Sequence, residues 1–501
     1  MTAALLIFAC CVIAVPKYCY SPFDAPKHCL AVIGGVVSLI LMGTGTMVNV
    51  NTNMLIACGV YAGWIVSCGA AGIGQSNWIR DTARQLSVML MCLLAVNFEH
   101  TMDLILAAAV LNCFAVLMQE KTLFCIPKLL KNKTIDGFMK TNKVGLTGNS
   151  NMVGCFLAPC VMLAMHRDMW MLAAVLAVFV YLSECKAAML ATFVGSMFYA
   201  GMVGCIELLM VSVFVLTVAV VLKAKDFMGS SMKERMKYWQ VALRQIKQAP
   251  LFGIGPDCFK INVPFIQEDL NDEGDGTWMK EVNYKRPWPR QAHNDFLQMC
   301  CDGGIPAGLA YLAFGVAGVV LNIGAPGLAA AMITLMVCGL MFHPMKVIPS
   351  MAVFWLIIFT GACGTPVTMG YWPLLLAVIT LPVLWRHAIS PLISDMYLRH
   401  HYNTIKEDSL IKAGQYDRWN NQVNWAKSQF YAMQGDAEFS YLSAVSALIG
   451  YDGNHKMWEL LNRLADMTEV FGGDNCAKIL SRRALRLYKY LPTAQRRMED
   501  G

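Results

Sequence analysis

Long apolar runs separated by short polar turns occupy most of the first 385 residues. A helix needs about 20 apolar residues to cross a bilayer, with a lower limit near 17. Backbone polar groups in lipid must be paired within their own segment, and the sequence lacks the alternating segments of about ten residues that a membrane β-barrel requires. The pattern therefore predicts about thirteen membrane-spanning helices. They are expected near residues 1–16, 28–48, 53–74, 84–98, 102–118, 152–167, 168–182, 186–204, 205–222, 295–322, 326–342, 346–361 and 369–385.

Two polar regions interrupt this pattern and divide the chain. We expect membrane helices in 1–222, a large helical loop in 223–292, further membrane helices in 293–385 and a helical soluble tail in 386–501. Glycines punctuate helix-length segments of the tail, whose apolar residues recur at three or four positions, as in paired helices of a solenoid. The segment 478–491 reads as a basic amphipathic helix. The predicted fold class is all-α, a polytopic integral membrane protein with about 12–13 transmembrane helices.

Composition supports the membrane interpretation. Hydrophobic residues make up 57% of the 501 residues and charged residues only 15%, against roughly 45–50% and about 25% in ordinary soluble chains. A soluble enzyme, a disordered protein and a nucleic-acid binder with a basic face are therefore excluded. The net charge of +7 is spread along the chain, so it indicates no partner beyond membrane lipids.

The 19 cysteines lie mostly in apolar runs, where cysteine behaves as a small hydrophobe. None of them stands in a C-x-x-C pair or in a Cys/His cluster with zinc spacing. We expect no metal site and no cofactor, with Asp257, Glu268 and Asp269 left open as alternative metal ligands.

Residues 288–312 carry the most informative polar pattern, because His293 and Asn294 stand where the loop enters the membrane. A histidine at the aqueous mouth of a cavity can accept a proton near neutral pH. Arg286 and Arg290 just before it can hold phosphate oxygens with their forked guanidinium groups. The simpler interpretation of a lone histidine here is a helix cap or an interfacial anchor.

The loop contains a second candidate region. A cationic amphipathic helix bears Arg235 and Trp239, and the turn P-L-F-G-I-G-P at 250–256 follows it. The glycines permit backbone conformations that other residues avoid. Trp239 equally suits a helix lying at the headgroup level.

Two further polar positions precede apolar runs. Asn149 and Asn151 sit among glycines before residue 152, where a turn and an N-cap are the simpler interpretation. Lys186 separates two predicted spans, where a lysine can extend its amine to the interface.

These stretches together resemble one family, the O-antigen ligases, O-antigen polymerases and bacterial protein O-oligosaccharyltransferases. The family's signature is H-N, nine residues and then G-x-x-G at the start of a span. It also shows R-x-x-x-W-x-x-A-L followed by P-L-F-G-x-G, and a G-x-x-G-N-x-N element upstream. In this sequence the first motif corresponds to His293, Asn294, Gly304 and Ala307. The second corresponds to residues 235–243 followed by 250–255, and the third to residues 145–151. The resemblance covers roughly 145–360. It departs from the family at Ala307, where glycine is usual, at Asp302, where glutamate is usual, and at Lys186, where arginine is usual.

The resemblance implies a glycosyltransferase that moves a glycan from an undecaprenyl-diphosphate carrier to an acceptor hydroxyl. The expected place is the periplasmic face of the bacterial inner membrane, and the expected reaction inverts the sugar without a metal. The implied catalytic residues are His293, Arg235, Arg290 and Lys186. The implied substrate-binding residues are Arg286, Asn294, Asn149, Asn151 and Trp239.

The acceptor stays open: lipid A core for a ligase, glycan for a polymerase, or a protein Ser/Thr hydroxyl for an oligosaccharyltransferase. The predicted span count puts both loop and tail outside the cytoplasm, whereas the lysine and arginine distribution suggests the opposite orientation. The resemblance agrees with the span count. A tail outside the cytoplasm would favour a protein acceptor. A flippase without chemistry is the alternative of another class.

Overall fold

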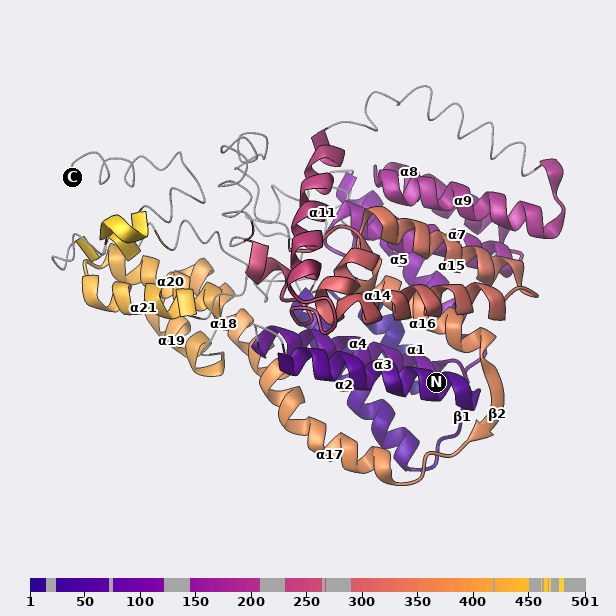
Figure 1. The fold of residues 1–501 in the computed structure, drawn as a ribbon, viewed down its shortest axis with the longest axis horizontal. Coiled ribbons are helices and arrows are strands. Elements are labelled where there is room, and N and C mark those ends of the chain that lie inside the picture. Colours follow the sequence, from indigo (N-terminus) through magenta and orange to yellow (C-terminus); the bar gives the residue numbers. More distant parts are fainter. Residues whose placement is uncertain are drawn as a thin grey trace.

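The computed structural model describes residues 1–14, 24–71, 75–120, 145–207, 230–263, 266, 290–417 and 420–449, and short pieces between 461 and 481. The helices of the body are α1 (Thr2–Val12), α2 (Asp24–Gly43), α3 (Thr52–Ala71), α4 (Gln75–Ala95), α5 (Thr101–Glu120), α7 (Ser150–His166), α8 (Trp170–Leu182), α9 (Lys186–Val203), α11 (Ser230–Gln248), α14 (Asp295–Leu321), α15 (Pro326–Met341), α16 (Ile348–Gly361) and α17 (Trp372–Leu384). Those of the tail are α18 (Ser390–Thr404), α19 (Glu407–Tyr416), α20 (Asn421–Met433) and α21 (Ala437–Ile449). Figure 1 shows their arrangement.

The all-α membrane fold is confirmed. Within the described residues, five helices are long and apolar enough to cross a membrane: Asp24–Gly43, Thr52–Gly69, Lys186–Val203, Asp295–Leu321 and Trp372–Thr404. Six shorter apolar helices accompany them. Each predicted span corresponds to a helix except 205–222, most of which lies outside the described residues. The chain is therefore a multi-pass membrane protein.

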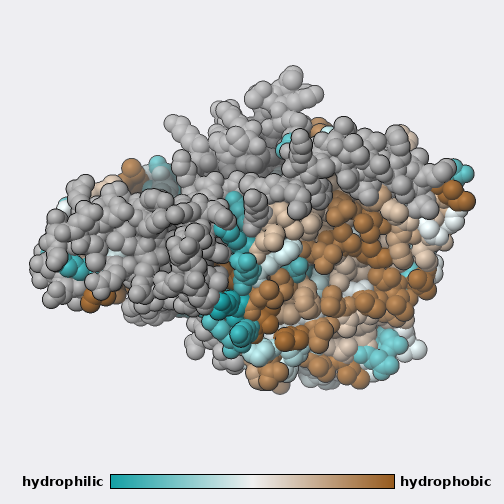
Figure 2. All heavy atoms as spheres, turned by 45° about the horizontal axis from the view of Figure 1, so that its top comes forward, coloured by the Kyte–Doolittle hydropathy of each residue, from teal (hydrophilic) through white to brown (hydrophobic). Residues whose placement is uncertain are grey.

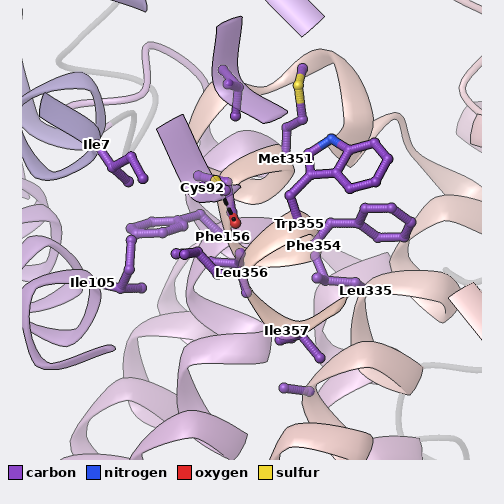
Figure 3. Close-up of a cluster of buried hydrophobic side chains, with 14 of the residues drawn as sticks. Ile7, Cys92, Ile105, Phe156, Leu335, Met351, Phe354, Trp355, Leu356 and Ile357 are labelled. Atoms are coloured by element: carbon purple, nitrogen blue, oxygen red, sulfur yellow. Dashed lines mark hydrogen bonds between the residues drawn. The ribbon is translucent and has the colours of Figure 1, made fainter. Parts of the chain in front are cut away.

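Helices α7 and α16 form the centre of the body because they are apolar on every side. All of α7 from Val153 to Met165 is buried, and so is α16 from Ile348 to Phe359. Figure 3 shows Phe156 of α7 near Leu356 and Ile357 of α16, with side chains of α1, α4 and α5 around them. A helix that is apolar on every side is stable only inside a bundle or in lipid.

Peripheral helices instead expose apolar side chains. Val60 of α3, Phe114 of α5, Val320 of α14 and Val378 of α17 are each more than half exposed. Figure 2 shows hydrophobic residues spread over this side of the body. Such contiguous apolar surface is unfavourable in water but suits contact with lipid tails.

One β-pair was not expected from the sequence. Strands β1 (Val48–Val50) and β2 (Cys363–Val367) pair antiparallel, and they lie at the opposite end of the body from the tail (Figure 1). Val48 and Val50 of β1 are buried, whereas most of β2 is exposed.

The tail continues from the last membrane helix without a break. The π-helical turn Trp385–Ile389 joins α17 to α18, so the predicted boundary at 386 falls inside a continuous helix. In the tail, α18 packs on α19, and α20 packs on α21 and α19, as paired helices do in a solenoid. Of the predicted basic helix 478–491, only 478–481 are described, and they are helical.

The loop and the tail lie on the same side of the body. Arg290 of the loop and Asp395 of the tail line one cavity, and Arg80 of α4 forms an ion pair with Asp417 of the tail at 3.4 Å. Figure 2 shows hydrophilic residues where the tail meets the apolar body. The side of the membrane on which the loop and the tail lie stays a prediction.

Candidate active site

His293 lies at the entrance to α14 among aromatic rings. Its backbone has φ 53°, in the left-handed region. The imidazole stacks on Tyr238 of α11, with ring centroids 5.6 Å apart, and contacts Phe342 at 5.8 Å and His343 at 4.9 Å. The Nδ1 atoms of both histidines are buried and have no hydrogen-bond partner among the described residues. Two imidazoles with a free nitrogen therefore meet where the loop joins the membrane.

Asn294 and Asp295 fix the segment that carries the second histidine. The Asn294 side chain accepts a hydrogen bond from the Leu297 amide at 3.0 Å, which caps α14, and donates to the Leu340 carbonyl at 3.0 Å. The Asp295 carboxylate accepts from the Met345 amide at 3.2 Å. The H-N-D sequence thus holds residues 340–345 against the start of α14. A direct contact of Asn294 with substrate stays a prediction.

Burial keeps both imidazoles neutral. Burial, together with the nearby Arg235 charge, lowers the pKa of His293 to about 4. Burial lowers the pKa of His343 well below its usual range, and the positive potential of its neighbours, Lys346 and Arg235 among them, acts in the same direction. His293 is therefore in the neutral form that can accept a proton at pH 7, and its lowered pKa makes it a weaker base than an unperturbed histidine.

We expect the acid limb of kcat/KM for the reaction that uses His293 to follow its lowered pKa. Because protonation destroys the base, activity is present above the folded-state pKa of about 4 and is lost as pH falls through it. An unperturbed histidine would lose activity near 6.5. Initial rates from pH 3.5 to 8, with thermal unfolding measured at each pH, check this expectation. An acid limb near 6.5 in protein that stays folded would contradict it.

Arg235 stands close to His293 and to the start of α9. It lies on α11, one turn before Tyr238, and its charge acts on the His293 ring and on the Cys185 thiol. Cys185 is the N-cap of α9, and Lys186 is its first residue. Trp239 follows on α11 with its buried Nε1 unpaired among the described residues. The stacking of Tyr238 on His293 thus places the part of α11 that carries Arg235 and Trp239 beside this histidine.

The 145–151 loop forms another side of the candidate site. Asn149 caps α7, and its side chain accepts from the Asn151 amide at 2.8 Å. The Leu146 carbonyl accepts a hydrogen bond from Lys27 of α2. Thr147 of this loop lines the cavity that Arg290 also lines. The predicted Arg286 lies outside the described residues.

The two glycine motifs interlock at a kink in α14. Gly303 and Gly304 leave the helical conformation, Gly304 with φ 76°. The freed groups pair with the P-L-F-G-I turn: Ile305 N–H donates to the Pro250 carbonyl at 2.7 Å, and Ile254 N–H donates to the Cys301 carbonyl at 2.8 Å. Gly304 thus allows the 250–255 turn to pack against the backbone of α14 at the kink. This contact fixes the loop, with α11, over the membrane helices.

Gly304→Ala should therefore destabilise the protein. A Cβ here would lie 2.0 Å from the Leu251 carbonyl oxygen, in a backbone conformation that favours glycine. The strain alone costs about 1–3 kcal/mol. Thermal unfolding in detergent measures the loss. Gly201→Ala in α9, where nothing lies within 4 Å, is the matched control and should not destabilise; equal melting temperatures for the two variants would contradict the contact.

A buried cluster of charges lies beside these motifs, and the sequence analysis did not identify it. Lys346, in the 3₁₀-helix Pro344–Lys346, contacts Asp81 of α4 at 2.7 Å and Asp302 of α14 at 2.5 Å. Arg84 also pairs with Asp81, and Gln298 donates to Asp302 at 2.8 Å. The available signal was Lys346 itself, a lone charge between two apolar runs.

A cavity of about 310 Å³ adjoins the cluster. It lies between the starts of α2 and α4, the 257–260 segment, the 343–349 segment and the first tail helices. Its charged lining consists of Asp24, Lys27, Arg80, Asp81, Arg84, Asp257, Lys260, Arg290, Lys346, Asp395 and Asp417. His343 also lines the cavity, and its ring contacts His293 as well.

A comparison with models of protein families tests the resemblance seen in the motifs. Residues 153–312 match the family model described as O-antigen ligase. This part of the chain is therefore similar to the O-antigen ligases. The comparison with curated proteins found no match. The O-antigen ligase match includes Arg235, the 250–255 turn, His293 and the kinked half of α14, and it confirms the resemblance inferred from the motifs.

The match supports a glycosyltransferase of the ligase or polymerase type. Two sets of residues make up the candidate site: Arg235 and His293 near the start of α9, and Arg290 with Thr147 of the 145–151 loop at the cavity. His343 and the charge cluster at Asp81 and Lys346 are the residues that sequence reasoning missed. Both His343 and Lys346 lie beyond the matched range.

Proposed function

We propose that this protein is a glycosyltransferase of the bacterial inner membrane that moves a glycan from an undecaprenyl-diphosphate carrier to an acceptor hydroxyl on the periplasmic face. The observation that carries the proposal is the neutral His293, which is enclosed by aromatic rings beside Arg235. A general base and a cation at one membrane-interface site are what transfer from a lipid diphosphate requires.

The reaction needs one proton acceptor and compensation for one developing charge. The acceptor oxygen forms a bond to the anomeric carbon while the bond from that carbon to the diphosphate oxygen breaks. The electron pair of the breaking bond stays with the diphosphate, and the hydroxyl proton goes to His293. Arg235, Arg290 and Lys186 stabilise the charge that develops on the leaving diphosphate. Direct displacement inverts the anomeric centre.

The first acceptor is lipid A core, which would make the protein an O-antigen ligase. The second is a protein Ser or Thr hydroxyl, and one observation favours it. The paired helices of the tail stand beside the cavity, on the side of the body that bears His293. A helical domain at that position could hold a protein acceptor. Glycan, the acceptor of a polymerase, is the third.

The decisive experiment is a transfer assay with purified protein in liposomes. A labelled undecaprenyl-diphosphate glycan is offered with lipid A core, lipid-linked glycan or a Ser-rich periplasmic protein, each with and without EDTA. We expect label on one acceptor, undiminished by EDTA. Intact donor recovered from every reaction would contradict the proposal. Movement of that donor across the bilayer would then identify a flippase.

A further inference from the structure

The turn at 250–253 presents two large apolar side chains on the surface of the protein. Leu251 is 63% exposed and Phe252 is 45% exposed. They follow the charged helix α11, which Figure 1 shows lying crosswise to membrane helices such as α9 and α15. Adjacent exposed apolar side chains in a polar loop are unfavourable in water and indicate a contact surface.

The folded chain holds this apolar pair in a fixed place. Two backbone hydrogen bonds, at 2.7 and 2.8 Å, join the turn to the kink of α14. The Phe252 ring stacks on Trp64 of α3, with ring centroids 5.2 Å apart and an angle of 14° between the ring planes. The turn is therefore fastened to two membrane helices, and Leu251 projects from it.

The exposed apolar face of α14 begins beside this turn. Between Asp295 and Gly304 no residue of α14 is exposed. After the kink, exposed apolar residues recur every three or four positions, at Ile305, Leu309, Leu312, Val316 and Val320. This spacing puts them on one face of the helix, where they suit contact with lipid tails. The turn thus adjoins one end of a lipid-facing stripe.

Charged residues end at the same level. On α14 the last charged residue is Asp302, just before the kink. On α4 the last is Arg84, and residues 85–95 carry no charge. Lys346 joins the two helices here through Asp302 and Asp81, so the two boundaries lie at one height. Because charged side chains are costly inside the hydrocarbon layer, this height marks the place where both helices enter it.

We propose that Leu251 and Phe252 insert into the acyl chains of the leaflet on the side of His293 and anchor the loop to the bilayer. Bilayer lipid is the partner because the pair continues the lipid-facing stripe that starts at Ile305. At about 1.5 Å of rise per residue, the start of α14 and His293 then stand about 10 Å outside the acyl layer along the helix axis. The anchor does not depend on which reaction the protein catalyses.

Depth-dependent fluorescence quenching tests this anchor. A fluorescent amino acid replaces Leu251 in the full-length protein, which is placed in phosphatidylcholine nanodiscs that contain no polyprenyl lipid. The lipid is brominated near the headgroup, brominated near the chain ends, or not brominated. The same reporter at Val316 of α14, which is 61% exposed, is the lipid-facing control, and at Met433 of the tail, which is 73% exposed, it is the control away from the stripe.

We expect lipid brominated near the headgroup to lower the fluorescence of the Leu251 reporter by about twofold and lipid brominated near the chain ends to lower it less. The Val316 reporter, three turns beyond Ile305, should show the reverse order, and the Met433 reporter should not respond. A Leu251 reporter that behaves like the one at Met433 would overturn the inference. Added undecaprenol that relieves quenching at Leu251 but not at Val316 would also overturn it, because the surface would then belong to a polyprenyl chain.

A second measurement uses the unmodified protein and so guards against a reporter that disturbs the turn. Phosphatidylcholine with a diazirine on its acyl chain is photolysed in the same nanodiscs, and the adducts are located by mass spectrometry. We expect adducts on the 250–253 turn and on the exposed stripe of α14, and none on α20 of the tail. Adducts on α14 with none on the turn would contradict the anchor.

Discussion

His293→Asn is expected to lower kcat for glycan transfer by about 10²–10⁴-fold, the usual contribution of a positioned general base. Asparagine is the sharper substitution because it tolerates the left-handed backbone at this position, φ 53°, better than alanine does. It keeps a polar side chain but removes the proton acceptor. The measurement is kcat and KM with a fixed lipid-linked donor, together with the melting temperature of each protein.

The control for this prediction is His400→Asn. His400 is an exposed histidine of α18, and its replacement should leave both constants unchanged. A His293→Asn protein with wild-type kcat and an intact melting temperature would remove His293 from the chemistry. An increase in KM alone would assign it to binding.

Lys346→Met should destabilise the protein by about 3–5 kcal/mol, the usual effect of removing one partner from a buried ion pair. The Lys346 and Asp302 side chains are almost completely shielded from solvent, at 2% and 0% exposed. Arg84 remains to neutralise Asp81 in the variant, but Asp302 loses its only ion-pair partner in the described part of the chain. The fall in melting temperature in detergent measures the effect.

Two variants make the Lys346 prediction specific. Lys346→Met combined with Asp302→Asn removes the unpaired charge and should recover part of the lost stability. Lys412→Met breaks an exposed pair with Asp408, in which the side chains are 45% and 72% exposed, and should change stability by less than about 1 kcal/mol. A Lys346→Met protein as stable as Lys412→Met would show that the cluster does not hold α4, α14 and the 343–346 segment together.

The sequence by itself determined the membrane helices and the contiguous motifs of the candidate site. Length and apolarity specify a membrane helix locally, so runs such as 152–167 and 346–361 predicted α7 and α16 well. The H-N and P-L-F-G motifs were recognisable because each is contiguous. Their spacing reflects a real contact, in which Gly304 opens α14 to the 250–255 turn.

Tertiary structure alone decided which distant residues meet. Lys346 pairs with Asp81 across 265 positions of the sequence, and no local periodicity records such a pairing. His343 lies beside His293 because the Asn294 and Asp295 hydrogen bonds hold its segment against α14. The burial of a segment can be predicted from its sequence because it depends on that segment's own apolar side chains. Charge pairing and cavity shape depend on how separate segments pack, and only the folded chain defines them.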